Sequence, residues 1–503
     1  MAQNTTNNSV IHAQLPSHGD PDLPPFKHRH ESSTVELFYD LFFVANLATF
    51  TANHEIVDAD SLKNYIGFFT ILWFTWLQTS LFDVRFATDS IFNRFCKAIS
   101  FGVMTGFAIC GAIYDTQNVG ENVKAFRALS IILMVSRLAL VLQYGVVLWY
   151  VHKWSKTILP MLCTMISLLI SAIIFLGTFW GYNLSNTGNS FPNQENGPQT
   201  YIAYYIVVCL EAGAVIAISC FWRVVSFKHT HLVERVGLLT LIIMGEGIIG
   251  MTKSVSQILQ NSTSTSSNDI GVIIAAVLLI YFIWVLYFDQ IEHDRFGTIR
   301  QQIWAMLHFP LHVCLILTVE GSTTLILWNI IIHSYLNWEN LYPVVEYADY
   351  SRDFTSAEAV LNYLNESITE FSREFKAGAL AKAVNYTEDL TKIRDLKPSF
   401  GSTEWNDQAG EIVDEIWLGV DNFIFENFGI EVPGQDQKAH TGNEAAQQDA
   451  LFNVFSTVFY YFYIAAGLFL VILAVMYWFG KRNKTKGEWA SMGVRLIAGA
   501  GIW

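Results

Sequence analysis

The chain has 503 residues, of which 52% are hydrophobic and only 15% are charged, against about 25% charged residues in an ordinary soluble domain. This balance excludes a soluble protein with one apolar core and favours a polytopic membrane protein. The net charge is −14, and residues 334–450 alone hold 22 Asp/Glu and 8 Lys/Arg. One acidic segment therefore accounts for the whole net charge, and it gives no reason to expect nucleic-acid binding.

Apolar runs long enough to cross a hydrocarbon core about 30 Å thick recur along the chain. They are continuously apolar, without the two-residue alternation of barrel strands, so the sequence predicts helices. The lipid bilayer is thus the first expected partner. We predict an all-α transmembrane bundle with ten complete spans, at about 35–52, 65–82, 95–114, 126–150, 157–180, 201–222, 234–251, 270–288, 304–333 and 451–479.

Composition divides the chain into four regions. Residues 1–33 are polar, contain four prolines and lack the apolar core of a signal peptide, which predicts a flexible tail. Residues 34–333 form a bundle of nine helices, and residues 334–450 an acidic insert with helices expected at 355–396 and 403–429. Residues 451–503 contain the tenth span, a basic loop and, at 491–503, the start of an eleventh span.

Basic residues alternate between the two sets of short loops, 16 on one set and 4 on the other. Loops rich in Lys and Arg stay in the cytoplasm. The sequence therefore predicts a cytoplasmic N terminus and an acidic insert that faces outward or into a lumen, where it could bind a protein partner. The identity of the membrane and the oligomeric state do not follow from this pattern.

Two motifs carry a family resemblance. The stretch Val-Glu36-Leu-Phe-Tyr-Asp40-Leu-Phe-Phe-Val resembles the opening motif of the low temperature requirement A family of membrane proteins, Glu-Leu-Phe-Phe-Asp-Leu-Val-Phe-Val. A second family-like stretch begins with Glu234-Arg235-Val-Gly and ends with Met-Gly-Glu246, and weaker echoes end at Asp89 and Asp289. The resemblance covers residues 31–330, and the added acidic insert suits a larger, eukaryotic-type member. It implies the membrane architecture but no reaction, because the family name describes a growth phenotype.

Two carboxylates lie near the predicted cytoplasmic end of the first span. Glu36 and Asp40 are four residues apart and share one helix face. Arg235 begins the seventh span at the same level. Two interpretations stay open: an inner gate or entry site for protons or cations, and a structural ion pair that joins the first and seventh helices.

Three further charges lie near the bilayer midplane. Arg137, Glu211 and Glu246 each follow the start of a span by ten to twelve residues, a depth of about 15–18 Å at 1.5 Å per residue. One arginine and two glutamates at equal depth predict a buried triad, either as part of a solute pathway or as a structural lock. Glycines flank Glu246 and favour either an unwound helix at a transport site or close helix packing. We therefore predict Glu246 as the best working residue and Arg137 as its partner.

The ninth span carries His308 and His312, which are four residues apart and share a helix face. A metal needs more ligands than these, and Glu320 lies about 12 Å farther along the axis. We therefore expect a proton relay or interhelical hydrogen bonds, with His312 as a pathway candidate, and neither a metal nor an organic cofactor.

The leading hypothesis is a proton-coupled transporter or channel-like protein for a small solute or ion, built on Glu246, Arg137 and Glu211 with the acidic pair near the inner mouth. The alternative is a membrane scaffold or sensor whose buried charges only lock helices together. An intramembrane enzyme that uses the two histidines ranks last, because no nucleophile and base occur at a suitable spacing, and we expect no enzymatic activity.

Overall fold

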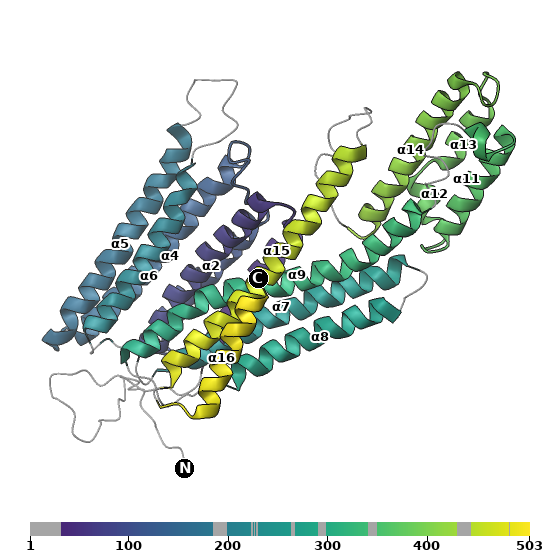
Figure 1. The fold of residues 1–503 in the computed structure, drawn as a ribbon. Coiled ribbons are helices and arrows are strands. Elements are labelled where there is room, and N and C mark those ends of the chain that lie inside the picture. Colours follow the sequence, from purple (N-terminus) through teal and green to yellow (C-terminus); the bar gives the residue numbers. More distant parts are fainter. Residues whose placement is uncertain are drawn as a thin grey trace, which may run out of the picture. The chain divides into compact units, whose positions relative to one another are not determined.

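The computed structural model describes residues 32–184, 199–222, 225, 227, 230–262, 267–289, 298–340, 350–429, 444–481 and 483–502. Throughout these ranges the chain is helical and forms no strand beyond one isolated bridge between Ser262 and Phe375. The all-α prediction is confirmed (Figure 1). Nearly all of the predicted tail, residues 1–31, lies outside the described residues.

Every predicted span coincides with a helix. The helices are α1 (Thr34–Asn53), α2 (Ala59–Phe86), α3 (Ile91–Gly111), α4 (Val123–Val151), α5 (Ser155–Leu184), α6 (Ile202–Phe221), α7 (Leu232–Asn261), α8 (Ser267–Phe288), α9 (Thr298–Glu339) and α15 (Glu444–Gly480). A short turn of 3-10 helix, Gln199–Tyr201, precedes α6. Within the described residues, eight helices have the length and hydropathy to cross a membrane, and α3 and α7 are not among them. The protein is a multi-pass membrane protein, and the count of ten crossings stays a prediction.

The remaining helices are α10 (Tyr350–Asp353), α11 (Ala357–Ser372), α12 (Ala379–Ala383), α13 (Tyr386–Arg394), α14 (Thr403–Asn427) and α16 (Lys486–Gly501). The helix expected over 355–396 is broken into α11, α12 and α13. Gly378 precedes α12 with φ +74°, a conformation that glycine adopts without steric cost. A residue of this kind ends a continuous helix, and the apolar spacing alone gave no sign of it.

The chain folds as two compact units. Unit 1 comprises residues up to Glu246, Trp284–Ile316 and Ile464–Trp503, and unit 2 comprises Gly247–Ile283 and Leu317–Tyr463. Four long helices, α7, α8, α9 and α15, contribute residues to both. The boundaries predicted at 333/334 and 450/451 are therefore not the limits of these units.

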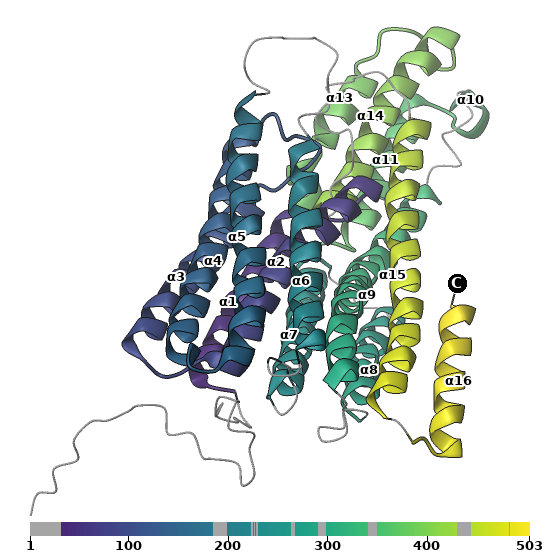
Figure 2. The ribbon, with the colours of Figure 1, turned by 90° about the vertical axis from the view of Figure 1, so that its left-hand side faces the viewer.

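Helix α2 is the inner helix of unit 1. In its most apolar stretch 94% of the residues are buried, against 22% in α8. It packs against α1, α4 and α6, while α3, α4 and α5 pack side by side in sequence order (Figure 2). Its first turn is fixed by Asp58, whose carboxylate accepts from the backbone N–H of Ser61, and the Ser61 hydroxyl accepts from the Asp58 N–H in return. The capping box fixes where α2 begins, and the burial of α2 among its neighbours keeps its polar side chains inside the bundle, away from lipid.

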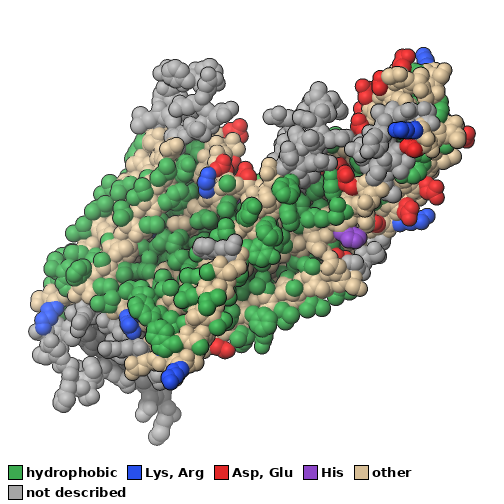
Figure 3. All heavy atoms as spheres, viewed as in Figure 1, with side chains coloured by type: hydrophobic (Ala, Val, Ile, Leu, Met, Phe, Trp, Pro, Cys, Tyr) green, Lys and Arg blue, Asp and Glu red, His purple; other side chains and the backbone are tan. Residues whose placement is uncertain are grey.

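The acidic insert is a small helical cap within unit 2. Trp338, at the end of α9, stacks on Trp417 of α14 with ring centroids 3.8 Å apart, and Phe371 of α11 packs against the same indole at 5.0 Å. The backbone N–H of Lys376 donates to the carbonyl of Asn261, at the end of α7. Aromatic packing and this backbone bond attach the cap to two helices of the unit. In Figure 3 hydrophobic side chains cover the visible helix faces, while Asp and Glu side chains gather over the cap.

The glycines around Glu246 do not unwind their helix, and one of them, Gly247, lets a neighbouring helix pack closely. Helix α7 is uninterrupted through this stretch. A Cβ atom at Gly247 would lie 1.8 Å from Cγ1 of Val319 on α9, whereas one at Gly245 meets nothing within 4 Å. Of the two interpretations left open by the sequence, the structure favours close helix packing.

We expect Gly247→Ala to lower the free energy of unfolding by about 1–3 kcal/mol, because α9 must move to admit the methyl group. Gly245→Ala is the matched control and should be neutral or stabilising by up to about 1 kcal/mol, since alanine favours a helix over glycine. Reversible unfolding in mixed micelles measures both. Equal effects of the two substitutions would contradict the packing role of Gly247.

Candidate functional site

Several buried polar side chains of unit 1 meet along one helix, α2. Seven of the buried residues of α2 form what we call the polar column: Trp73, Thr75, Trp76, Gln78, Thr79, Ser80 and Asp83. From Thr75 to Asp83 the column is about 12 Å long at 1.5 Å per residue. Six of the seven contact ionic or polar groups on α1, α3, α4, α7 and α9. The column therefore organises the candidate site.

The midplane arginine pairs with one of the two predicted glutamates. Arg137 Nε on α4 lies 3.0 Å from Glu211 Oε2 on α6, and both side chains have 0% exposure. Arg137 Nη1 donates to the hydroxyls of Thr75, at 3.1 Å, and Ser136, at 2.8 Å. The ring of Phe175 on α5 lies 5.5 Å from the guanidinium carbon. One arginine thus joins α2, α4, α5 and α6.

Glu246 does not join this pair. Within the described part of the chain, no ion pair or hydrogen bond links Glu246 to Arg137, and the predicted pairing of these two residues is wrong. The reason is geometric: equal depth does not place two side chains on facing sides of their helices. Glu246 is half-buried, and its Oε2 is enclosed without a hydrogen-bond partner. It is thus the candidate carboxylate that no basic side chain neutralises among the described residues.

The acidic pair of α1 meets two basic residues from the start of α7. Arg235 Nη2 donates to Asp40 Oδ1 at 2.9 Å, and Arg235 Nη1 lies 2.9 Å from Asp40 Oδ2. Two residues of the polar column complete this contact, because Trp76 Nε1 donates to Asp40 Oδ1 at 2.8 Å and Ser80 Oγ accepts from Arg235 Nη2 at 3.2 Å. Only the contact of Nη2 with Oδ1 is a hydrogen bond, whereas Nη1 and Oδ2 lie within ion-pair distance without hydrogen-bond alignment. The ion pair joins α1 and α7, which is what the structural interpretation of the sequence expects.

Glu36 has a different partner from Asp40. Its Oε2 lies 2.9 Å from Nε2 of His231, the residue immediately before α7. The same side chain takes part in the capping box of α1 with Ser33, whose backbone N–H donates to Glu36 Oε2 at 3.4 Å. Glu36 therefore fixes the first turn of α1 and binds the chain just ahead of α7.

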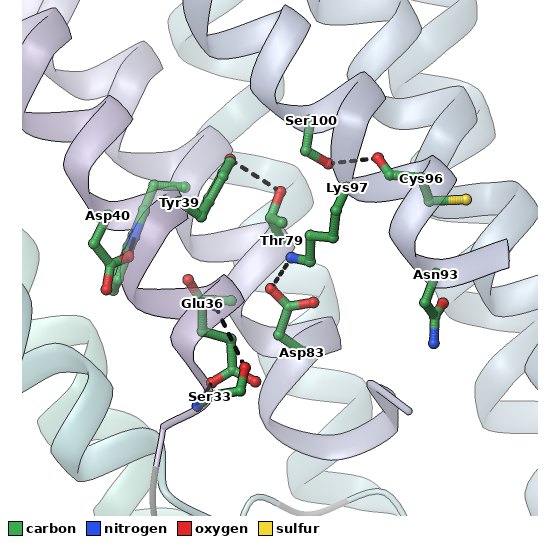
Figure 4. Close-up of polar contacts among 12 residues, drawn as sticks. Ser33, Glu36, Tyr39, Asp40, Thr79, Asp83, Asn93, Cys96, Lys97 and Ser100 are labelled. Atoms are coloured by element: carbon green, nitrogen blue, oxygen red, sulfur yellow. Dashed lines mark hydrogen bonds and ion pairs between the residues drawn. The ribbon is translucent and has the colours of Figure 1, made fainter. Parts of the chain in front are cut away.

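A third acid–base pair adjoins these two. Asp83, at the lower end of the polar column, accepts from Lys97 of α3, and both side chains are buried (Figure 4). The Lys97 ammonium also lies 5.1 Å from the ring centroid of Tyr39, whose hydroxyl donates to Thr79 at 3.3 Å. Glu36, Asp40 and Asp83 thus face one basic side chain each.

We call the six residues Glu36, Asp40, Asp83, Lys97, His231 and Arg235 the ionic cluster. Its three carboxylates face two cationic side chains, Lys97 and Arg235, and the imidazole of His231. Glu36, Asp40 and Asp83 each leave one carboxylate oxygen without a hydrogen-bond partner among the described residues. Buried oxygens of this kind bind water or a proton, because an unsatisfied acceptor is costly in an apolar interior.

The two histidines of α9 are held by hydrogen bonds that fix their tautomers. The indole N–H of Trp73 only donates, so His312 Nδ1 accepts at 3.0 Å and Nε2–H donates to Thr240 Oγ1 at 2.7 Å. The carbonyl of Trp304 only accepts, so His308 Nδ1–H donates to it at 2.9 Å, and His308 Nε2 lies in hydrogen-bond contact with the Tyr287 hydroxyl at 2.8 Å.

The His312 imidazole is therefore neutral, and in both rings each nitrogen is already engaged in a hydrogen bond rather than available to a metal. Within the described residues, no group of three or more His, Cys, Asp and Glu side chains could hold a metal ion. Interhelical hydrogen bonding thus accounts for both histidines, including the pathway candidate His312.

The family model described as bacterial low temperature requirement A protein matches residues 31–330, which are more than half of the chain. The chain belongs to the low temperature requirement A family. No curated protein and no solved structure matches it significantly. The family match ends before the cap of α10–α14.

Within the region of the low temperature requirement A match, the separate motifs meet in space. Asp40 of the first motif pairs with Arg235 of the second, and Tyr287, the first residue of the last weak echo, forms a hydrogen bond with His308. Residues from three of the four stretches that resemble the family pattern thus lie in the interior of unit 1.

Sequence reasoning missed half of the ionic cluster. Asp83 and Lys97 lie near predicted span ends, where charges usually reach solvent, and Lys97 was counted among the loop residues that set orientation. His231 lies between two spans. One available signal was the composition of α2, which carries Thr75, Gln78, Thr79, Ser80 and Asp83 within nine residues of an apolar run.

Proposed function

We propose that the chain is a proton-coupled transporter or channel-like protein for a small solute or ion, with Glu246 as the group that takes up and releases the proton. One observation carries the proposal: Glu246 is a carboxylate deep in α7 whose Oε2 is enclosed without a partner. Burying an ionised carboxyl without a counter-charge is costly. Protonation, or the arrival of a cation, removes that cost.

The other carboxylates serve a different purpose in this proposal. Arg137 neutralises Glu211, and Arg235 neutralises Asp40. Pairs of this kind hold helices in register, because breaking one leaves a charge alone in a dry interior. We therefore assign Glu246 to proton exchange and the Arg137–Glu211 and Arg235–Asp40 pairs to positioning. The proposal contains no enzymatic step, since the ring nitrogens of both histidines are engaged in hydrogen bonds.

In the proposed orientation the N terminus is cytoplasmic and the cap faces outward or into a lumen. The support is the 16-to-4 division of basic residues between alternate short loops. The ionic cluster then lies at the cytoplasmic end of the proton path, and the acidic cap is available to a protein partner on the opposite side.

The full chain in liposomes tests the proposal through proton uptake. A potassium diffusion potential drives protons inward, and a pH-sensitive dye inside the vesicles reports them. We expect Glu246→Gln to reduce the uptake at least tenfold without loss of thermal stability, because the glutamine is neutral and nearly isosteric. Glu211→Gln is the control of equal depth, and its main effect should be on stability. Unchanged proton uptake in Glu246→Gln would contradict the assignment.

A scaffold or sensor is the second candidate function, and the Arg137–Glu211 pair favours it. Every side chain in that pair is enclosed and bound to neighbouring helices, as in a lock without transport. If this candidate is right, the wild-type chain should show no more proton uptake than empty vesicles, and Glu246→Gln should only raise its melting temperature.

A further inference from the structure

Arg85 is a half-buried cation without an ionic partner among the described residues. It lies at the end of α2 and lines a cavity together with Phe86, Tyr144 and Met161, which belong to an apolar cluster. Its guanidinium carbon lies 4.0 Å from the ring centroid of Phe227, and its Nη2 is enclosed without a hydrogen bond. No carboxylate among the described residues pairs with it. A charge in this setting is costly unless a counter-ion joins it.

A small cavity opens beside Arg85. Its volume is about 10 Å³, close to the minimum for a single enclosed water molecule. Four polar residues contribute to its wall, namely Arg85, Tyr144, Thr164 and Ser219, and the rest of the wall is apolar. Among the described residues, no acidic side chain that could attract a cation lines the cavity.

The hydrogens still available at the cavity belong to Arg85 and Tyr144, because the other two hydroxyls donate theirs elsewhere. Thr164 Oγ1 donates its hydrogen to the carbonyl of Pro160 at 3.0 Å. Ser219 Oγ donates to Gln302 Oε1 at 2.8 Å or to the carbonyl of Ile216 at 3.1 Å. The hydroxyl of Tyr144 and the Nη2 of Arg85 have no hydrogen-bond partner in the described part of the chain. A cavity with apolar walls, one cation and one available hydroxyl hydrogen is suited to bind an anion.

We propose that this cavity binds one anionic ligand atom between Arg85 and Tyr144, and that the ligand is a halide such as chloride. A single oxygen of a lipid phosphate offers the same chemistry. The volume favours a monatomic ion, because a whole phosphate group does not fit. The bound anion would neutralise the end of α2 and stabilise the packing of α2, α4, α5 and α6. This inference does not depend on the proposed transport.

The test uses the full chain in nanodiscs of phosphatidylcholine, in gluconate buffer of constant ionic strength, titrated with sodium bromide or chloride. A ligand that binds only the folded state raises the melting temperature as its concentration increases. We expect that rise in the wild-type chain, and at least a tenfold weaker apparent affinity in Arg85→Gln. Tyr144→Phe keeps the ring that packs on Phe82 and Phe86 and should also weaken binding, so the proposal stays testable if Arg85→Gln does not fold.

The matched control is Arg127→Gln. Arg127 also lies over a phenylalanine ring, 4.2 Å from the centroid of Phe179, and its Nε has no partner, but it does not line this cavity. Nanodiscs that contain phosphatidylglycerol without halide form the second arm. Stabilisation there that needs Arg85, with no effect of halide, would identify a lipid phosphate oxygen as the ligand. If neither halide nor anionic lipid acts through Arg85, or if both arginine variants respond alike, the site is excluded.

Discussion

Replacing Arg137 by methionine is expected to lower the free energy of unfolding by about 3–5 kcal/mol, which is the usual cost of removing one partner of a buried ion pair. Glu211 would remain as an uncompensated charge with 0% side-chain exposure, and Thr75 and Ser136 would lose the donor that binds them. Unfolding of the purified full chain in mixed micelles measures the change.

Two comparisons separate the charge effect from other losses. In the double variant Arg137→Met, Glu211→Met both charges are gone, and replacement of a whole buried pair by apolar residues is often neutral or stabilising. We therefore expect most of the loss to be recovered. The surface pair Arg94–Asp89 has N···O distances of 2.9 and 3.0 Å, but both side chains are over 70% exposed, so Arg94→Met should leave the free energy of unfolding nearly unchanged. A double variant as unstable as Arg137→Met would contradict this account.

Depth along a helix could be predicted from the sequence, but the direction of a side chain around the helix could not. Counting residues from the start of each span located Arg137, Glu211 and Glu246 inside the bundle. The choice of Glu211 as the partner of Arg137 depends on how α4 and α6 are rotated against α2. That rotation follows from the packing of Thr75, Phe175 and their neighbours, which no spacing rule contains.

The helices were the most predictable part of the structure, because a membrane span must satisfy its own backbone. Continuous apolar runs therefore gave helices at all ten positions. The cap was less predictable, since apolar residues at three- and four-residue intervals continue across Gly378, where the chain turns. The bridge between Ser262 and Phe375 pairs segments more than a hundred residues apart, and local sequence carries no signal for such a contact.

Charges near span ends were misjudged for a physical reason. A lysine at such a position can extend to the interface, so Lys97 was treated as a loop charge, and the structure instead binds it to Asp83 in the interior. The cue lies on the partner helix: α2 is apolar enough to span and still carries hydroxyl, amide and carboxyl groups in consecutive turns. A span with that composition faces protein on all sides, and charges on neighbouring helices become its partners.

The second large effect is expected at Arg235, which fixes α7 to α1. Arg235→Met should lower the free energy of unfolding by about 3–5 kcal/mol, because Asp40 would be left with a neutral indole donor, Trp76, and no cation. Arg235→Lys should lie between this variant and the wild type: lysine restores the charge but cannot contact both oxygens of Asp40 in one plane. Unfolding in mixed micelles at low and high salt should give the same order, since enclosed charges are screened little.

A second substitution, which removes the charge of Asp40, tests whether electrostatics cause the loss of stability in Arg235→Met. Asn in place of Asp40 keeps an acceptor for Trp76 but carries no charge, so adding Asp40→Asn to Arg235→Met should recover a large part of the stability. The guanidinium carbon of Arg235 also lies 5.8 Å from the Trp76 ring, and its aliphatic stem fills space that methionine retains. If adding Asp40→Asn to Arg235→Met restores no stability, the loss comes from the contact of Arg235 with Trp76 and Ser80, and the ion pair is not what joins α7 to α1.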